Sequence, residues 1–344
     1  MVTDTVPRHT HTAPVHEPPA AIRAAGIVAV LTVALALVAI AFALPAARTA
    51  PRDVPIGLAG PQAAQGHAAA ILDQQAPGAF AITYYPGEAA LRAAIRDRDV
   101  YGGIAFGPDG RSLLIATGGS PMVAQMLTQI GNGIGHRAGG AGPATSDAVP
   151  LNTEDLAPPA VDDPRGAGLA ASALPITLAG LLPAVALVLA LKREVWTRFA
   201  AVVIFSGLAG VSIAALLQYV LGSIDANFWG VAGGLTLGVL AAGLLMLGLG
   251  SMFGRVGLAL GALTALLLGN PLSGLTSAPE MLPVGWGQLG QWLPQGANAT
   301  LLRSTAFFDG AGGALPVVVL TCWSLIGVAL IVAAAMRQRG TSAE

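Results

Sequence analysis

Residue types that commonly do chemistry are few in this chain, and they form no reactive group. The only cysteine, Cys322, lies inside an apolar run, which favours a small buried residue over a disulfide or metal ligand. Three histidines of the Pro-rich N-terminal tail suit a metal, although such a tail is more often simply disordered: His9, His11 and His16. The sequence contains no phosphate-binding GxxxxGK[ST] loop, no HExxH pair and no GxSxG turn. We therefore expect no enzymatic activity and no cofactor or metal in this chain.

Apolar runs dominate the rest of the sequence. Charged residues make up 10% of the chain, against about 25% in soluble domains. The uncharged runs cover residues 24–44, 166–191, 199–224, 228–254, 256–279 and 310–336. A helix needs about 20 apolar residues to cross a membrane, so only the fifth run, apolar over 256–268, is short. We predict an α-helical polytopic membrane protein with six transmembrane helices, surrounded by lipid. A net charge of −1 argues against nucleic-acid binding.

Basic residues between the runs predict the orientation, because short loops rich in Lys and Arg stay in the cytoplasm. Three clusters fall on one side if the first run goes from inside to outside: Lys192, Arg193 and Arg198; Arg255; Arg337 and Arg339. Both termini are then cytoplasmic in a bacterial cell membrane, and residues 45–165 lie outside. Residues 41–43, Ala-Phe-Ala, resemble a signal-peptidase site, but the run is longer than a signal core, so we expect an uncleaved anchor.

The expected domain organisation follows from these runs. It comprises a disordered cytoplasmic tail (1–23), a transmembrane helix (24–44), an extracytoplasmic α/β domain (45–138), a linker (139–165), a membrane bundle of five helices (166–336) and a cytoplasmic tail (337–344). Within the outer domain, alternating patterns predict strands at 54–59, 80–85, 101–106 and 112–117, and helices at 62–75, 88–99 and 122–134. The charged residues 96–99 are interpreted as a solvated helix end. Residues 139–165, rich in Gly, Pro and Asp, are typical of a linker.

Two patterns stand out in the membrane half. No ionisable residue lies in the middle of a long run, which argues against an ion-coupled carrier. Gly230, Gly234 and Gly238 recur every four residues, a spacing that lets helices pack closely, either within one chain or at a dimer seam.

Residues 270–310 fit neither a plain loop nor a lipid-facing span. The segment is half apolar but contains four prolines and two tryptophans. These features favour short helices, at 287–293 and 297–308, that dip into the outer leaflet and return while shielded by protein.

The order of these elements, with the motifs NPLSG (270–274), PEMLP (279–283), WLPQG (292–296) and LLRSTAFF (301–308), resembles permease subunits of type-two ABC exporters. The subgroup related to phage-infection proteins, with a large outer domain after the first span, is the most similar. The outer-domain stretches VPIGL, PGAFAITYY and VYGGIAF resemble that subgroup too.

The resemblance implies a permease that exports a hydrophobic or amphipathic cargo. Its partners would be a separate P-loop ATPase, which binds the ATP, and a second permease copy or paralogue. The ATPase would contact the loop between the second and third spans, here Lys192, Arg193, Glu194, Trp196 and Arg198, although basic residues there also satisfy the positive-inside rule. The outer gate would comprise Asn270, Pro271, Glu280, Pro283, Trp292, Pro294 and Arg303.

Two other functions remain open. One is a membrane scaffold or receptor that binds an envelope partner through its outer domain without transport. A membrane enzyme is less favoured, because the catalytic motifs are missing.

Overall fold

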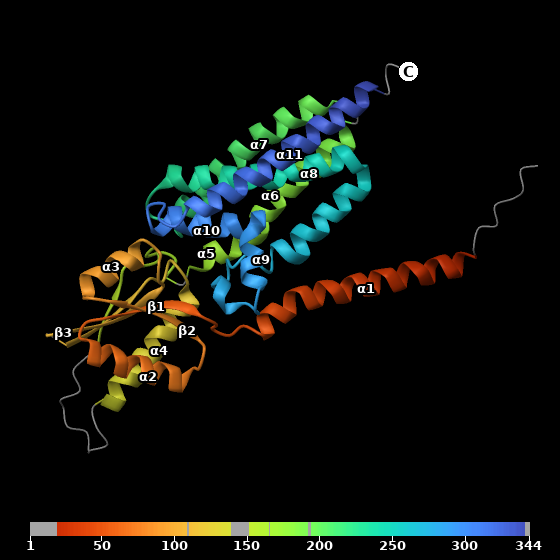
Figure 1. Cartoon of the computed structure of the whole chain (residues 1–344). Helices are drawn as coiled ribbons and strands as arrows, with labels where there is room; N and C mark the ends of the chain where they lie inside the picture. The colour runs from red at the N-terminus through yellow and green to blue at the C-terminus, as the bar shows by residue number, and fades with distance from the viewer. Residues whose placement is uncertain (1–18, 109, 139–150, 165, 192–193, 341–344) are drawn as a thin grey trace, which may run out of the picture.

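A computed structural model describes residues 19–108, 110–138, 151–164, 166–191 and 194–340, and consists of a helical bundle and a small α/β domain (Figure 1). Five helices among these residues are long and apolar enough to span a membrane: Ala20–Pro45, Ala167–Ala190, Val195–Val220, Phe228–Gly269 and Ala314–Arg339. The α/β domain lies between the first and second of them in the chain. The chain is therefore built as a multi-pass membrane protein.

The count of five rather than six arises at α8 (Phe228–Thr264), which continues into a π-helical turn, η2 (Ala265–Gly269). Gly254 has φ 62° and ψ −138°, a non-helical conformation that breaks α8. Residues 246 and 261 would lie about 22 Å apart in a straight helix. Instead, Met246 Sδ is 2.9 Å from the position that a Cβ on Gly261 would take. The chain folds back at Gly254, and residues 255–269 form a short return arm along α8, so the predicted fifth crossing is not a separate long span.

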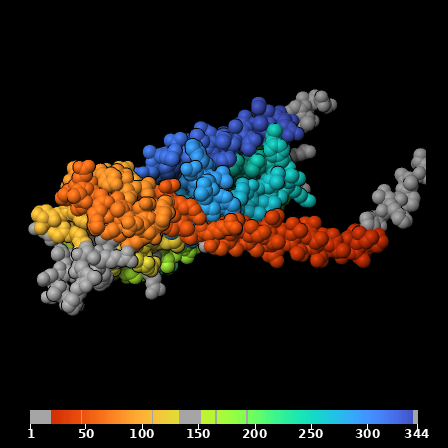
Figure 2. Space-filling model, turned by 60° about the horizontal axis from the view of Figure 1, so that its bottom comes forward, coloured from red at the N-terminus to blue at the C-terminus, as the bar shows by residue number. Residues whose placement is uncertain are grey.

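The other membrane helices pack around α8. They are α6 (Ala173–Ala190), preceded by the short α5 (Ala167–Ala171), α7 (Val195–Ala215) with the π-helical turn η1 (Leu216–Val220), and α11 (Ala314–Gly340). Small residues allow close contact: Gly180 faces Ala242, and Gly327 faces the backbone of Leu244. In contrast, α1 (Ala20–Ala47) stands apart from the bundle except near η2, and its apolar surface is uncovered along its length (Figures 1 and 2).

The α/β domain contains a five-stranded mixed sheet in the order β2-β1-β3-β4-β5. Its strands are β1 (Val54–Ala59), β2 (Phe80–Tyr85), β3 (Gly102–Gly107), β4 (Gly110–Ile115) and β5 (Leu151–Asp155). Only β3 and β4 pair in antiparallel fashion. α2 (Gln62–Gln75) and α4 (Pro121–Ala138) pack in the core on one face, and α3 (Glu88–Arg96) packs in the core on the other. The strands and helices predicted for residues 54–134 are present, with shifts at their ends.

β5 lies within the predicted linker at 139–165, of which residues 139–150 and 165 lie outside the described residues. Its sequence, Leu-Asn-Thr-Glu-Asp, lacks the alternation of apolar and polar residues that predicts a strand. For that reason the sequence predicted a linker here. β5 pairs in parallel with β4, and Glu154 accepts hydrogen bonds from Arg92 of α3. That contact holds the pKa of Glu154 below its usual value. Asp155 Oδ1 accepts hydrogen bonds from the amides of Thr117 and Ala157, so polar contacts replace apolar ones at this edge.

Residues 270–310 join the two parts of the molecule. They contain η3 (Pro279–Met281), α9 (Trp286–Trp292) and α10 (Pro294–Phe307), close to the two short helices predicted from sequence. α10 runs antiparallel to α8, with Leu301 near Gly234 and Asn298 against Gly238. Ala278 and Met281 enter the α2/α4 core, and Phe308 enters the α3 core. Both faces of the sheet are thus completed by this segment.

Candidate functional site at the junction

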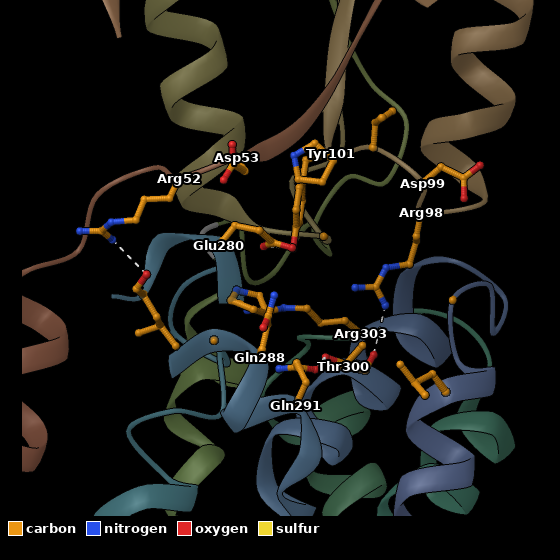
Figure 3. Close-up of a pocket in the computed structure, with 18 of the residues that line it drawn as sticks. Arg52, Asp53, Arg98, Asp99, Tyr101, Glu280, Gln288, Gln291, Thr300 and Arg303 are labelled. Atoms are coloured by element: carbon orange, nitrogen blue, oxygen red, sulfur yellow. Dashed lines mark hydrogen bonds between the residues drawn. The ribbon is translucent and has the colours of Figure 1, made fainter. Parts of the chain in front are cut away.

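A cavity of about 620 Å³ lies where the α/β domain meets residues 270–310 (Figure 3). Its upper wall comes from the segments before β1 and β3, and its floor comes from η3, α9 and α10. The volume falls within the range of ligand pockets, which hold mostly apolar surface and a few convergent polar groups.

Arg98 projects into this cavity from the turn after α3 (Figure 3). Its backbone has φ 66°, a left-handed conformation that is uncommon for a long side chain. Nη1 donates hydrogen bonds to Thr300 O at 3.1 Å and Ser304 Oγ at 2.5 Å, and the guanidinium lies 5.1 Å from the Phe308 ring centre. Burial lowers the pKa of Arg98 from its usual value. These contacts with α10 hold the strained residue in place.

Tyr101 and Glu280 form the central polar pair of the cavity. The Tyr101 hydroxyl donates a hydrogen bond to Glu280 Oε2 at 2.9 Å. This hydrogen bond links the segment just before β3 to η3. Burial, followed by the Glu280 charge, raises the pKa of Tyr101 well above its usual range. Tyr101 therefore stays protonated at physiological pH, and its hydroxyl occupies one carboxylate oxygen of Glu280.

Two further arginines line the cavity. Arg303 of α10 is buried, and its Nη atoms donate to Gly274 O and Leu275 O, each at 2.6 Å. Arg52, at the rim, donates to Leu282 O at 2.9 Å. Neither these two nor Arg98 forms an ion pair with a carboxylate of the described residues. Their hydrogen-bond acceptors are carbonyl and hydroxyl oxygens. These groups carry no net charge, so they do not neutralise the positive charge of the guanidinium groups.

The remaining side of the cavity is apolar. Trp292 at the end of α9 and Leu315 of α11 line it and are about 60% exposed, at 62% and 59%. Val319, one turn further along α11, lies deeper and is buried. Because α11 is a candidate membrane span, the cavity adjoins the start of an apolar surface.

A second cavity, of about 400 Å³, lies among α6, α8, the return arm and α11. Most of its lining is aliphatic, including Leu181, Met246, Leu260 and Ile326. Trp323 of α11 and the start of α10 line it, and Trp323 Nε1 donates to Trp292 O at 2.7 Å. This contact between the two tryptophans connects the linings of the apolar cavity and the junction cavity.

A polar cluster lies between α6, α8 and α10. Asn270, Ser273, Gln295, Asn298 and Thr177 surround a space of about 20 Å³, enough for one water. Asn298 is 4% exposed, and its Oδ1 has no hydrogen-bond partner among the described residues.

The predicted outer-gate residues divide between these spaces. Glu280, Pro283, Trp292 and Arg303 line the junction cavity. Asn270 and Pro294 line the small polar space, and Pro294 also borders the apolar cavity. Pro271 lines none of the three.

The loop predicted to contact an ATPase lies between α6 and α7, at the end of the bundle away from the α/β domain (Figure 1). Lys192 and Arg193 lie outside the described residues. Glu194 precedes α7, and Trp196 is 53% exposed and packs edge-on against Phe199. Arg198, the remaining candidate, is only 2% exposed. Its Nε has no partner among the described residues.

The glycine stripe lies partly against α10. Gly234 and Gly238 face Leu301 and Asn298, whereas Gly230 lies beside the side chain of Asn227, the cap of α8.

Sequence reasoning missed the outer-domain half of the junction cavity. Arg98 belongs to residues 96–99, which were interpreted as a solvated helix end; for Arg98 that interpretation is wrong, because its side chain contacts α10. Arg52 and Tyr101 gave no local signal. The one available clue was Glu280, a lone carboxylate in an apolar segment that needs a donor.

Comparison of the chain with family models, curated proteins and solved structures gives no match.

Proposed function

We propose that this chain is the permease subunit of an exporter that moves a hydrophobic or amphipathic cargo out of a bacterial cell, powered by a separate ATPase. The observation that carries the proposal is the aliphatic cavity of about 400 Å³ among α6, α8 and α11. A space of this size with a mostly aliphatic lining suits an acyl chain or another apolar group. The tryptophan contact at its border with the junction cavity would act as the outer gate.

The proposed orientation places the α/β domain outside and both termini inside. Arg337 Nη1 lies 3.5 Å from Met252 O, so the basic residues Arg255 and Arg337 gather at one end of the bundle. The positive-inside rule favours the cytoplasm for that end. α10 then begins near Ala242 of α8, about 21 Å along that helix from its start at Phe228. That depth exceeds half of a hydrocarbon core of about 30 Å, as expected of a re-entrant segment.

The return arm has a role in the same arrangement. It starts at the proposed cytoplasmic end and leads, through Asn270, to the outer segment at η3. Together with that segment it would make the sixth crossing, interrupted by irregular backbone that neighbouring helices shield. The exposed Trp196 at the cytoplasmic end would be the main contact for the ATPase.

The first test is purification of the full chain from native membranes under mild detergent, with identification of the co-purifying proteins. We expect a P-loop ATPase in stoichiometric amount. The complex is then reconstituted into liposomes, and ATP-dependent movement of a fluorescently labelled phospholipid is measured. Absence of both the ATPase and lipid movement would contradict the proposal.

A matched pair of variants links that movement to the cavity. Thr264 lines the apolar cavity, whereas its neighbour Leu263 is 51% exposed and does not line it. We expect T264W to reduce lipid movement at least tenfold by filling the cavity. L263W adds a tryptophan of the same size and should leave it near the wild-type rate; equal effects of both changes would dissociate transport from the cavity.

A scaffold or receptor is the second candidate function. The observation in its favour is β2, which pairs only with β1 among the described strands and leaves Tyr84 56% exposed at a sheet edge. Open edges bind extended segments of other proteins. Recovery of an envelope protein in place of an ATPase, lost on Y84P, would favour this function, because the Tyr84 amide faces the open edge whereas Tyr85 O pairs with the Gly60 amide after β1.

A further inference from the structure

We propose that the junction cavity binds the anionic headgroup of an amphipathic lipid, with the phosphate among Arg98, Arg303 and Arg52 and the acyl chains along Trp292 and α11. This site goes beyond the proposed transport, because it requires neither an ATPase nor movement of cargo.

The charge of the partly buried lining points to an anion. Three arginines and one carboxylate, Glu280, line the cavity with side chains that are buried or half-buried. The other two carboxylates, Asp53 and Asp99, are exposed, and Asp99 points away from Glu280 and Arg303 (Figure 3). Solvent screens exposed charges much more than buried ones. The shielded part of the cavity therefore keeps an excess of positive charge.

The arginines retain donors for a phosphate. A guanidinium has five N–H groups in a planar fork that suits phosphate oxygens. Arg98 uses only Nη1 in hydrogen bonds to the described residues, which leaves Nε and Nη2 available. Gln288, an exposed side chain of α9, adds an amide to the floor of the cavity (Figure 3).

The apolar side of the cavity distinguishes a lipid from a free anion. Trp292 and Leu315 leave apolar surface open directly beside the charged groups. Val284, at 86% exposure, extends this surface. α11 continues from Leu315 as an apolar helix. In the orientation proposed above, this surface meets the outer leaflet, where headgroups and acyl chains are separated in the same way.

The test measures binding to the purified full chain by native mass spectrometry, with short-chain (dioctanoyl) phosphatidylglycerol, the phosphatidylcholine of the same chain length, and inorganic phosphate as probes. We expect the anionic lipid to bind at least tenfold more tightly than the zwitterionic one, and inorganic phosphate to compete only weakly. Equal binding of the two lipids would refute selectivity for an anionic headgroup. Tight competition by inorganic phosphate would refute a lipid as the ligand.

Two substitutions with opposite expected effects on lipid binding test whether the lipid binds in this cavity. Q288E adds a negative charge at the cavity floor and should weaken binding of the anionic lipid about fivefold. E280Q removes the inner carboxylate, while Oε1 of the new amide still accepts the Tyr101 hydrogen bond. This substitution should strengthen binding of the anionic lipid severalfold. Q74E, on the exposed face of α2, changes the net charge as Q288E does and should have no effect. Structural damage would weaken binding in both cavity variants, so the same direction in both, or no change in either, would refute the site.

Discussion

At the scale of single residues, the junction is marked by buried and half-buried arginines that form no ion pair with a carboxylate of the described residues. Arg303 is the clearest case, because it is 6% exposed and supplies both hydrogen bonds to consecutive carbonyls of the loop after η2. A buried acceptor left without its donor costs about 1–3 kcal/mol. Arg303 therefore stabilises the loop that leads to η3, and through it the wall of the cavity.

Removal of that side chain gives a direct prediction. R303M keeps an unbranched chain of similar length but leaves Gly274 O and Leu275 O without donors, so we expect a loss of about 3 kcal/mol in unfolding free energy. R255M removes an exposed arginine and should change the unfolding free energy by less than about 0.5 kcal/mol. Thermal unfolding in detergent, followed by tryptophan fluorescence, measures both. Equal melting temperatures would show that the buried hydrogen bonds contribute little.

The hydrogen bonds of Asp163, near the start of the second candidate span, indicate that the stability of the chain depends on pH. Asp163 Oδ1 and Oδ2 accept hydrogen bonds from the amides of Ala167 and Gly168, each at 2.8 Å. Burial raises the pKa of Asp163, but the hydrogen bonds outweigh it and hold that pKa below the usual value. The stabilisation is therefore present above the unfolded pKa of about 3.9 and is lost as pH falls through the lower folded value.

D163A tests this dependence. At pH 7 we expect it to lower the unfolding free energy by about 1–2 kcal/mol, as for loss of a helix cap. The difference in melting temperature between wild type and variant should shrink below about pH 4. A difference that stays constant from pH 7 to pH 3 would contradict a role for the ionised carboxylate.

Residues of the site were predictable only where the local sequence was unusual. Glu280 and Arg303 stood out as charges in an apolar segment, and both line the cavity. Arg98 and Tyr101 look ordinary among outer-domain residues, because their partners, Ser304 and Glu280, lie about 200 positions away in the chain, at separations of 206 and 179. Pairings at that distance depend on tertiary packing that a local pattern does not contain.

At the scale of elements, the hairpin of α8 depends on one glycine. Gly254 adopts φ 62° and ψ −138°, a combination that L side chains rarely take. We expect G254A to destabilise the chain by about 1–3 kcal/mol and to loosen the return arm. G233A is the control, since Gly233 lies on the same helix with open space around its Cβ position and an ordinary φ. Thermal unfolding and limited proteolysis near residue 254 compare the two; matching profiles would mean that the turn tolerates a side chain.

Elements with a clear period were predicted well, and those without one were not. β1, α2 and β2 occupy the predicted residues because apolar side chains recur at strand or helix spacing. β5 is a polar edge strand held by Arg92 and by backbone pairing. The return arm was recognised as short, but its fold-back follows from a backbone conformation at Gly254 that composition does not reveal.

At the scale of the whole molecule, the two parts share their cores. Phe307 lies against Gly118, where a side chain in place of the glycine hydrogen would clash with the Phe307 ring, and Phe308 packs in the α3 core. Met281 enters the opposite core. A movement of α10 therefore cannot occur without a matching movement of the α/β domain or loss of these contacts. Binding in the junction cavity would change the free energy of that movement, because its walls belong to both parts.

The orientation of the molecule yields the last prediction. In a C322A background, Q74C places a single thiol on the α/β domain, and R255C places one beside the Gly254 turn. Because the basic residues gather at the turn, we expect a membrane-impermeant maleimide to label Q74C on intact spheroplasts and to label R255C only after permeabilisation. The reverse pattern would invert the proposed topology. Labelling of both on intact spheroplasts would place the two ends on one side, which is incompatible with a bundle that crosses the membrane between them.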